Sequence, residues 1–176
     1  MRTKFWASLL LLAASCTAAS AATLTLPSGK RISYSAGSGC TRYIIPLAGK
    51  ARSTLCLQRD ASVAKDAAAK SIRLVAEVPN VALVVTETDA SIPGGMSYCQ
   101  AGEEVFLRVI ALKGRQAKQT YQQKLASCRQ DVELADPGLS WSPESRTLSI
   151  HWLSPPTGIP DSLTLHIDDS GEVIQP

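Results

Sequence analysis

The chain has 176 residues, of which 18 are Lys or Arg and 15 are Asp or Glu. This length is enough for one domain with a hydrophobic core and short for two. Once the two basic residues of the N-terminal leader are set aside, the mature protein is close to neutral, which argues against nucleic acid as a partner.

The N-terminus, residues 1–22, has the order of features found in a secretory signal peptide. A basic start precedes an apolar run over residues 5–14, and the small residues 19–22 offer a cleavage region. The apolar run is too short for a transmembrane helix, which needs about 20 residues. We therefore predict an exported protein, periplasmic or secreted, with a single disulfide-stapled domain over residues 23–176.

Cys16 leaves a second route to the envelope open, because residues 12–16 form a loose lipoprotein box. A stronger box has leucine three residues before the cysteine, where this chain has Ala13. We favour cleavage after Ala21 or Ala22 and soluble release. Lipid attachment at Cys16 is the alternative, and only in that case would the membrane be a partner.

The first part of the domain alternates in polarity in the manner of short β-strands. Residues 23–26 and 31–34 are expected to pair as strands, and residues 40–46 and 50–57 to form a hairpin. A loop over residues 47–49 would place Cys40 and Cys56, one on each arm of this hairpin, directly opposite each other. That spacing suits a disulfide without moving the backbone.

One short surface helix is expected over residues 60–71, because Asp60 can cap it and the stretch is rich in alanine and free of Gly and Pro. Strands over residues 72–78 and 81–88 follow. Residues 81–85 are apolar at every position, which is typical of a central strand covered on both faces.

A long hairpin is expected next, with residues 104–112 as its first arm. Residues 115–128 have apolar side chains at helical spacing, but they also fit a returning strand. We favour the strand, because a turn centred on residues 113–114 would set Tyr121 across from Phe106, an aromatic pair of the kind that stabilises sheets.

Four cysteines remain after Cys16 is set aside, and an even number in an exported protein predicts disulfides. The two turns place the cysteines opposite each other in pairs, so we predict the bonds Cys40–Cys56 and Cys99–Cys128. A zinc site is disfavoured because there is no Cys-x-x-Cys and neither histidine has ligand-like spacing. We expect no metal and no cofactor.

The last third alternates cleanly between apolar and polar residues. Strands are expected over residues 131–134, 139–141, 148–152, 163–167 and 173–174, with a turn at residues 136–138. The whole pattern predicts a mainly β domain, either a sandwich or a strongly bent antiparallel sheet.

The loop before Cys99 is the candidate partner-binding segment. It carries a glycine pair, an apolar side chain and an aromatic one, in the residues Pro93, Gly94, Gly95, Met96 and Tyr98. Met and Tyr adapt to and anchor protein interfaces. The alternative is that these side chains pack against the domain's own edge, with the glycines present only for their turn dihedrals.

Catalytic features are sparse. His151 and His166 each lie on the polar side of an alternating strand, where they could share a face with Asp168 and Ser149 as an acid–base cluster. Solvated histidines are the simpler interpretation, because no nucleophile or ligand motif accompanies them. The adjacent carboxylates at 103–104 point to opposite faces of a strand and cannot act as a glycosidase pair.

Charge is unevenly distributed along the chain. Residues 23–73 hold nine Lys or Arg and two Asp, whereas residues 74–176 hold seven basic and thirteen acidic residues. The basic half could face an anionic surface such as lipopolysaccharide, phospholipid or an acidic protein. We favour the simpler interpretation that the two halves pair within the fold.

Two classes of function therefore fit the sequence. The preferred hypothesis is an envelope protein that acts by binding an envelope or extracellular protein, for example as an inhibitor or immunity-type partner of an envelope-targeting enzyme. The alternative is an exported hydrolase that uses His151, His166 and Asp168. A structural component of the envelope is a third hypothesis. Binding is preferred because scaffold features are abundant and catalytic motifs are not.

Overall fold

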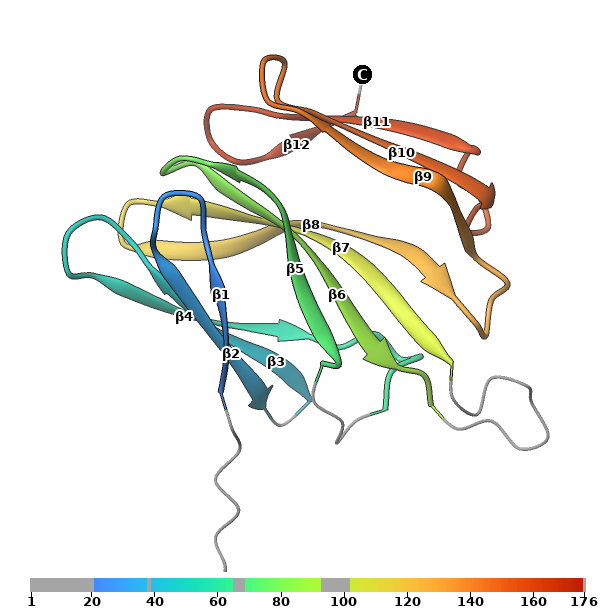
Figure 1. Ribbon diagram of the computed structural model, residues 1–176, viewed down its shortest axis with the longest axis horizontal. Coiled ribbons are helices and arrows are strands. Elements are labelled where there is room, and N and C mark those ends of the chain that lie inside the picture. The colour runs from blue at the N-terminus through green and yellow to red at the C-terminus, as the bar shows by residue number, and fades with distance from the viewer. Residues whose placement is uncertain (1–20, 38, 65–68, 93–101, 176) are drawn as a thin grey trace, which may run out of the picture.

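The protein is a three-layer stack of β-sheets. The computed structural model describes residues 21–37, 39–64, 69–92 and 102–175, and within them twelve strands form three four-stranded antiparallel sheets in chain order (Figure 1). The predicted mainly β fold class is confirmed. In these residues, no helix has the length and apolarity needed to cross a bilayer.

Each sheet is built from strands that are close in sequence. The N-terminal sheet consists of β1 (Ala22–Thr25), β2 (Arg31–Gly37), β3 (Cys40–Pro46) and β4 (Arg52–Gln58). The central sheet consists of β5 (Ser71–Val78), β6 (Ala82–Ala90), β7 (Glu103–Lys113) and β8 (Gln116–Ser127). The C-terminal sheet consists of β9 (Glu133–Ser142), β10 (Thr147–Ser154), β11 (Ser162–Ile167) and β12 (Val173–Ile174).

The central sheet is covered on both faces, with the other two sheets on opposite sides of it (Figure 1). Alternate residues of β6 enter different cores: Leu83 and Val85 pack against the N-terminal sheet, and Ala82 and Val84 against the C-terminal sheet. All four have no solvent exposure. This explains why residues 81–85 are apolar at every position, and it confirms the predicted central strand.

Residues 116–127 form a strand, as predicted, but its register differs from the expected one. The turn is centred on residues 114–115, with Lys113 opposite Gln116 and Gly114 at a φ of +60°. A glycine with positive φ suits the first central position of a type II′ turn. Two further register shifts lie along β7 and β8.

These shifts change the cross-strand pairs. Tyr121 lies opposite Val109, and Phe106 lies opposite Lys124, so the predicted Tyr121–Phe106 pair is wrong. A side chain changes face when its strand slips by one residue. Tyr121 consequently packs on the core shared with the C-terminal sheet.

The predicted helix over residues 60–71 is not confirmed. In its described residues, 60–64 and 69–71, the chain forms a turn, an isolated bridge from Val63 to Ser91, and the start of β5. Asp60 does cap a segment, but its Oδ1 accepts hydrogen bonds from the backbone amide and hydroxyl of Ser62, at 2.9 and 2.6 Å. This is a local Asx turn, which competes with helix for the same side chain.

The predicted turn at residues 136–138 lies inside β9 as a large bulge, and the strand continues on both sides of it. Leu134 faces Trp152 and Leu139 faces Ile150, so the four residues between them lie opposite His151 alone. The strand accommodates a cis Asp136–Pro137 bond and shifts its register against β10 beside it. Pro and Gly within a strand are typical of such an irregularity as well as of a turn.

The Cys40–Cys56 disulfide is present, with a Cα–Cα distance of 5.6 Å. The two residues are not directly opposite, since Cys56 faces Arg42 and Cys40 faces Gln58. Cys128 is also disulfide-bonded, and its amide donates to the Glu103 carbonyl at 3.4 Å. Cys99 lies outside the described residues, so the Cys99–Cys128 pairing stays a prediction. The hydrogen bond to the Glu103 carbonyl places Cys128 opposite Glu103, whereas the predicted hairpin register places it opposite Cys99.

Candidate functional site

The outer face of the N-terminal sheet is the most distinctive exposed surface of the described residues. Strand alternation sends Ile32, Tyr43 and Ile45 inward, where each is at most 1 % exposed. The alternate positions carry exposed arginines on three adjacent strands, Arg31 on β2, Arg42 on β3 and Arg52 on β4. We call these three residues and the surface between them the arginine face.

The arginine face has no negative charge of its own. Residues 22–58 contain five Lys or Arg and no Asp or Glu. The three arginines take part in none of the ion pairs formed by the described residues. The expected pairing of the two halves does occur between Lys70 and Glu103, at 3.1 Å, but it does not extend to this face.

The opposite end of the stack has the reverse charge. Residues 131–176, which include the C-terminal sheet, contain eight acidic residues and one arginine. Because the central sheet separates the two outer sheets, the molecule is polarised along the stacking direction. Such an asymmetry orients a molecule as it approaches a charged partner.

The centre of the arginine face is hollowed and holds two apolar side chains, Ile44 and Pro46. A depression of about 300 Å³ is lined by residues of the first four strands: Thr23, Arg31, Ser33, Ile44, Pro46 and Arg52. Ile44 is 38 % exposed, although it lies in the middle of a sheet. Arginines around an exposed aliphatic side chain resemble the composition of protein interfaces.

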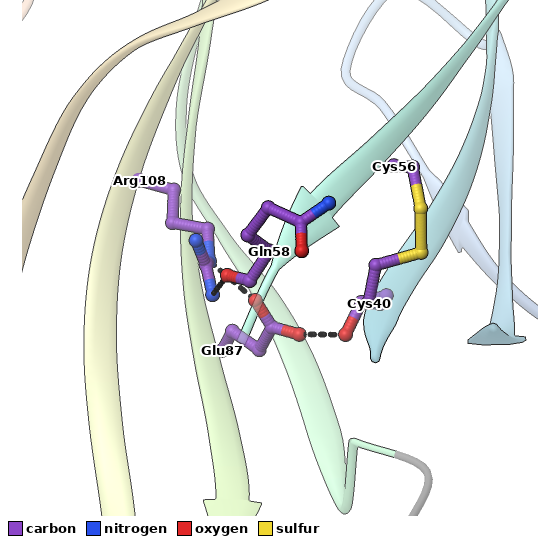
Figure 2. Close-up of a disulfide and its surroundings, with 6 residues drawn as sticks. Cys40, Cys56, Gln58, Glu87 and Arg108 are labelled. Atoms are coloured by element: carbon purple, nitrogen blue, oxygen red, sulfur yellow. Dashed lines mark hydrogen bonds and ion pairs between the residues drawn. A yellow bond between two sulfur atoms is a disulfide. The ribbon is translucent and has the colours of Figure 1, made fainter. Parts of the chain in front are cut away.

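A buried polar cluster joins the N-terminal sheet to the central sheet at one end of their shared core. Its centre is an ion pair between Glu87 of β6 and Arg108 of β7, both fully buried. Thr41 donates to the second oxygen of Glu87. Figure 2 shows the Glu87 carboxylate and Gln58 beside the Arg108 guanidinium, with the Cys40–Cys56 disulfide on the side away from Arg108.

Arg108 is almost completely satisfied by hydrogen bonds. Besides Glu87 it donates to Gln119 at 2.9 Å, Gln122 at 2.8 Å and the Gln58 carbonyl at 3.3 Å. A buried guanidinium is tolerated only when its donors are used in this way. The bonds from Thr41 to Glu87 and from Arg108 to the Gln58 carbonyl thus connect the N-terminal sheet to the central sheet.

A second group of polar residues continues the cluster toward the segment 93–101. Glu104 is buried and accepts hydrogen bonds from Ser91 at 2.8 Å and Ser62 at 3.0 Å, and Lys124 lies 3.5 Å away. Its neighbour Glu103 is exposed and faces the other way, toward Lys70. The adjacent carboxylates therefore do not act on a common site.

Asp89 is buried, only 1 % exposed, and its carboxyl has no hydrogen-bond partner among the described residues. Burial, reinforced by the negative charge of Glu87, raises the pKa of Asp89 from 3.8 to about 6, against the opposing effect of Arg59 and Arg108. Burial also raises the pKa of Tyr43 well above its usual value. Tyr43 is therefore uncharged near neutral pH, whereas Asp89 is mostly ionised at pH 7 and becomes protonated as the pH falls through about 6.

The candidate loop residues Pro93, Gly94, Gly95, Met96 and Tyr98 lie outside the described residues, but the base of the segment is described. The Ser91 amide donates to the Gly102 carbonyl at 3.1 Å, which closes the two ends against each other. Arg129 donates to the Ile92 carbonyl at 3.0 Å. Cys16, the candidate lipid site, also lies outside the described residues.

The histidines share a face but are far apart. His151 lies opposite Ser162 and His166 opposite Thr147, so four residues, about 13 Å, separate them along the strands. Both side chains are exposed, and His151 Nδ1 lies 2.8 Å from the Ser162 hydroxyl. Asp168 Oδ1 accepts two backbone amides in its own turn, at 2.8 and 2.9 Å. The geometry brings no acid–base cluster together here.

Sequence reasoning missed both the arginine face and the buried ion pair. Counting charges along the sequence identified a basic half of the chain. It could not show that three of the arginines share one face, because that depends on how the strands pair. The ion pair did leave a signal: Arg108 is the single charged residue in the otherwise apolar run over residues 105–112. A single charge in such a strand indicates a buried partner.

The chain matches no family model, and no curated protein and no solved structure shows significant similarity to it.

Proposed function

We propose that this is an exported cell-envelope protein that acts by binding an acidic envelope or extracellular protein through its arginine face. The observation that carries the proposal is the conjunction of three exposed, unpaired arginines with an exposed Ile44 on a sheet that has no acidic residue. Such a surface would suit a protein that inhibits an envelope-targeting enzyme or gives immunity to it.

A protein is favoured over a lipid surface by the mixed character of the face. Arginine is enriched in protein interfaces, where its planar fork binds carboxylates with defined geometry. The apolar centre at Ile44 and Pro46 adds area that becomes desolvated on contact. Segments that bind anionic membranes instead carry clusters of about 4–8 Lys or Arg, more than the three arginines of this face.

The scaffold suits this role because little of it has to be ordered on binding. The disulfide connects β3 to β4, the two strands that carry Arg42, Ile44 and Arg52. The buried cluster holds the other face of the same sheet on the central sheet. A surface that is already ordered loses less entropy when it binds. The disulfide also supports the expectation of an oxidising, extracytoplasmic compartment.

The test is affinity capture from envelope extract with the exported protein and two charge-reversed variants. Arg31→Glu/Arg52→Glu changes the arginine face, and Arg115→Glu/Lys118→Glu makes the same change of net charge at the exposed β7–β8 end. We expect the first variant to lose a partner that the second retains. Equal recovery by both variants would refute the arginine face as the binding surface.

Two further arms identify the kind of partner and the role of the loop. Binding to anionic phospholipid vesicles, lost in Arg31→Glu/Arg52→Glu, would show that the face recognises membrane and not protein. Met96→Ala/Tyr98→Ala tests whether the loop contributes, and a loss of partner in this variant alone would move the interface to the loop.

A further inference from the structure

A second concave surface lies between the central and C-terminal sheets, on the far side of the central sheet from the arginine face. It is a cleft of about 530 Å³. Residues of the four central-sheet strands, with Lys70 just before β5, form its floor, and residues of β9 form its wall. The lining residues are Lys70, Ser71, Arg73, Thr86, Thr88, Glu103, Val105, Leu125, Leu134 and Leu139. This volume is within the range of small-molecule sites.

The floor of the cleft changes from charged to apolar across the sheet. One row of neighbouring residues runs from β5 to β7 as Ser71, Thr88 and Val105, and the adjacent row as Arg73, Thr86 and Leu107. Leu125 of β8 lies beyond them and is 1 % exposed. Apart from Glu103, which pairs with Lys70, the lining of the floor changes from polar on β5 and β6 to apolar on β7 and β8.

The wall of the cleft is apolar at the same end as the floor. Leu134 and Leu139 of β9 are half-buried and pack against the core that contains Leu107 and Leu125. The inner end of the cleft is thus enclosed by aliphatic side chains on two sides. Water there has few hydrogen-bonding groups to contact, which favours its replacement by apolar ligand atoms.

The outer end of the cleft has an available positive charge. Lys70 is paired with Glu103 at 3.1 Å, but Arg73 forms no ion pair with any described residue. The hydroxyls of Thr86 and Thr88 lie on β6, between Arg73 and the apolar end, and the Ser71 hydroxyl lies beside Arg73 on β5. They can donate to an anionic group that Arg73 attracts.

We propose that this cleft binds an amphiphile with an anionic head group and a single aliphatic chain, such as a long-chain carboxylate. The head group lies at Arg73 and the neighbouring hydroxyls, and the chain lies across the strands and ends under Leu134 and Leu139. Four strands span about 14 Å, which gives room for an extended chain rather than for a compact ligand. This site is separate from the arginine face, so either proposal can fail without the other.

The experiment is isothermal titration of the exported, disulfide-intact protein with dodecanoate below its micelle-forming concentration. We expect saturable binding of one molecule per chain. Arg73→Glu should weaken the affinity at least tenfold, because the head group then meets a negative charge. Arg115→Glu, which makes the same charge change on a remote exposed turn, should leave the affinity unchanged. Equal affinities for wild type and Arg73→Glu would overturn the proposal.

Two comparisons separate the site from non-specific binding. Acetate has the same head group without the chain and should not bind measurably, and binding of acetate as tight as that of dodecanoate would refute the role of the apolar end. In methyl NMR spectra, dodecanoate should shift the methyl signals of Leu134 and Leu139. Shifts confined to Leu153, which is 70 % exposed elsewhere on the C-terminal sheet, would likewise refute it.

Discussion

Replacement of Asp89 by Asn should stabilise the protein above pH 6. The Asp89 carboxyl is 1 % exposed and without a hydrogen-bond partner, and it faces Glu87 on its own strand and Glu104 across from it on β7. Arg59 and Arg108 offset only part of the cost of its charge, because the pKa of Asp89 remains raised to about 6. Asn has nearly the same shape and carries no charge.

The magnitude follows from the linkage between protonation and folding. A rise in pKa from 3.8 in the unfolded chain to about 6 in the folded protein corresponds to about 3 kcal/mol. Because the folded pKa is the higher one, this stability is present below pH 3.8 and is lost as the pH rises through about 6. The stabilisation of Asp89→Asn relative to wild type should therefore grow by about 2 kcal/mol between pH 4.5 and pH 8.

The assay is urea unfolding of wild type and Asp89→Asn at several pH values, with disulfides intact. The difference between the two proteins isolates Asp89 from every other titrating group. Asp161→Asn, at an exposed carboxyl, is the matched control and should show a difference that does not change with pH. A difference for Asp89→Asn that is flat, or that falls as the pH rises, would refute the reasoning.

Three further changes test the scaffold. Arg108→Met should destabilise the protein by about 3–5 kcal/mol, because it leaves the buried Glu87 unpaired. The double variant Glu87→Leu/Arg108→Met should cost less, because it leaves no unpaired charge. Denaturant unfolding measures both variants, and a double variant less stable than Arg108→Met would contradict the pairing. Cys40→Ala/Cys56→Ala should lower the free energy of unfolding by about 3 kcal/mol, given a sequence separation of 16 residues, and an unchanged urea midpoint would show that the bond constrains nothing. Gly171→Ala should cost about 2–4 kcal/mol, because its φ is +79° and a Cβ would lie 2.7 Å from that of Ala111. Gly158→Ala, at a φ of +82° in open space, should cost only about 1 kcal/mol, and equal thermal shifts for the two would show that the contact is not tight.

Strand existence was accessible from sequence because alternation depends on neighbours in the chain. The apolar run at residues 81–85 indicated a strand covered on both faces, and the central sheet has one. The Cys40–Cys56 pairing was also accessible, although it rested on a register two residues in error. Cysteines that are offset by two residues on adjacent strands still point to the same face, so the conclusion survived the error.

Register and bulges were not accessible in the same way. The turn at Gly114 differs from the expected one by a single residue, and two shifts along β7 and β8 add to it. Residues of β7 and β8 enter the cores shared with both other sheets, and those contacts are not visible in the hairpin's own sequence. Asp60 is a similar case, because the choice between helix cap and Asx turn is decided by what the following residues contact.

By itself, the sequence determined most of the residues that form strands, which faces of those strands are apolar, and that the β domain carries the Cys40–Cys56 disulfide. Those properties are local, since they follow from period-two alternation and from composition. Only the tertiary structure decided that Arg31, Arg42 and Arg52 share an exposed face, that Glu87 and Arg108 meet in a buried pair, and that a cleft opens beside Arg73. Each of these depends on strand pairing or on the stacking of sheets, and a few tenths of a kcal/mol spread over many contacts are enough to set a register.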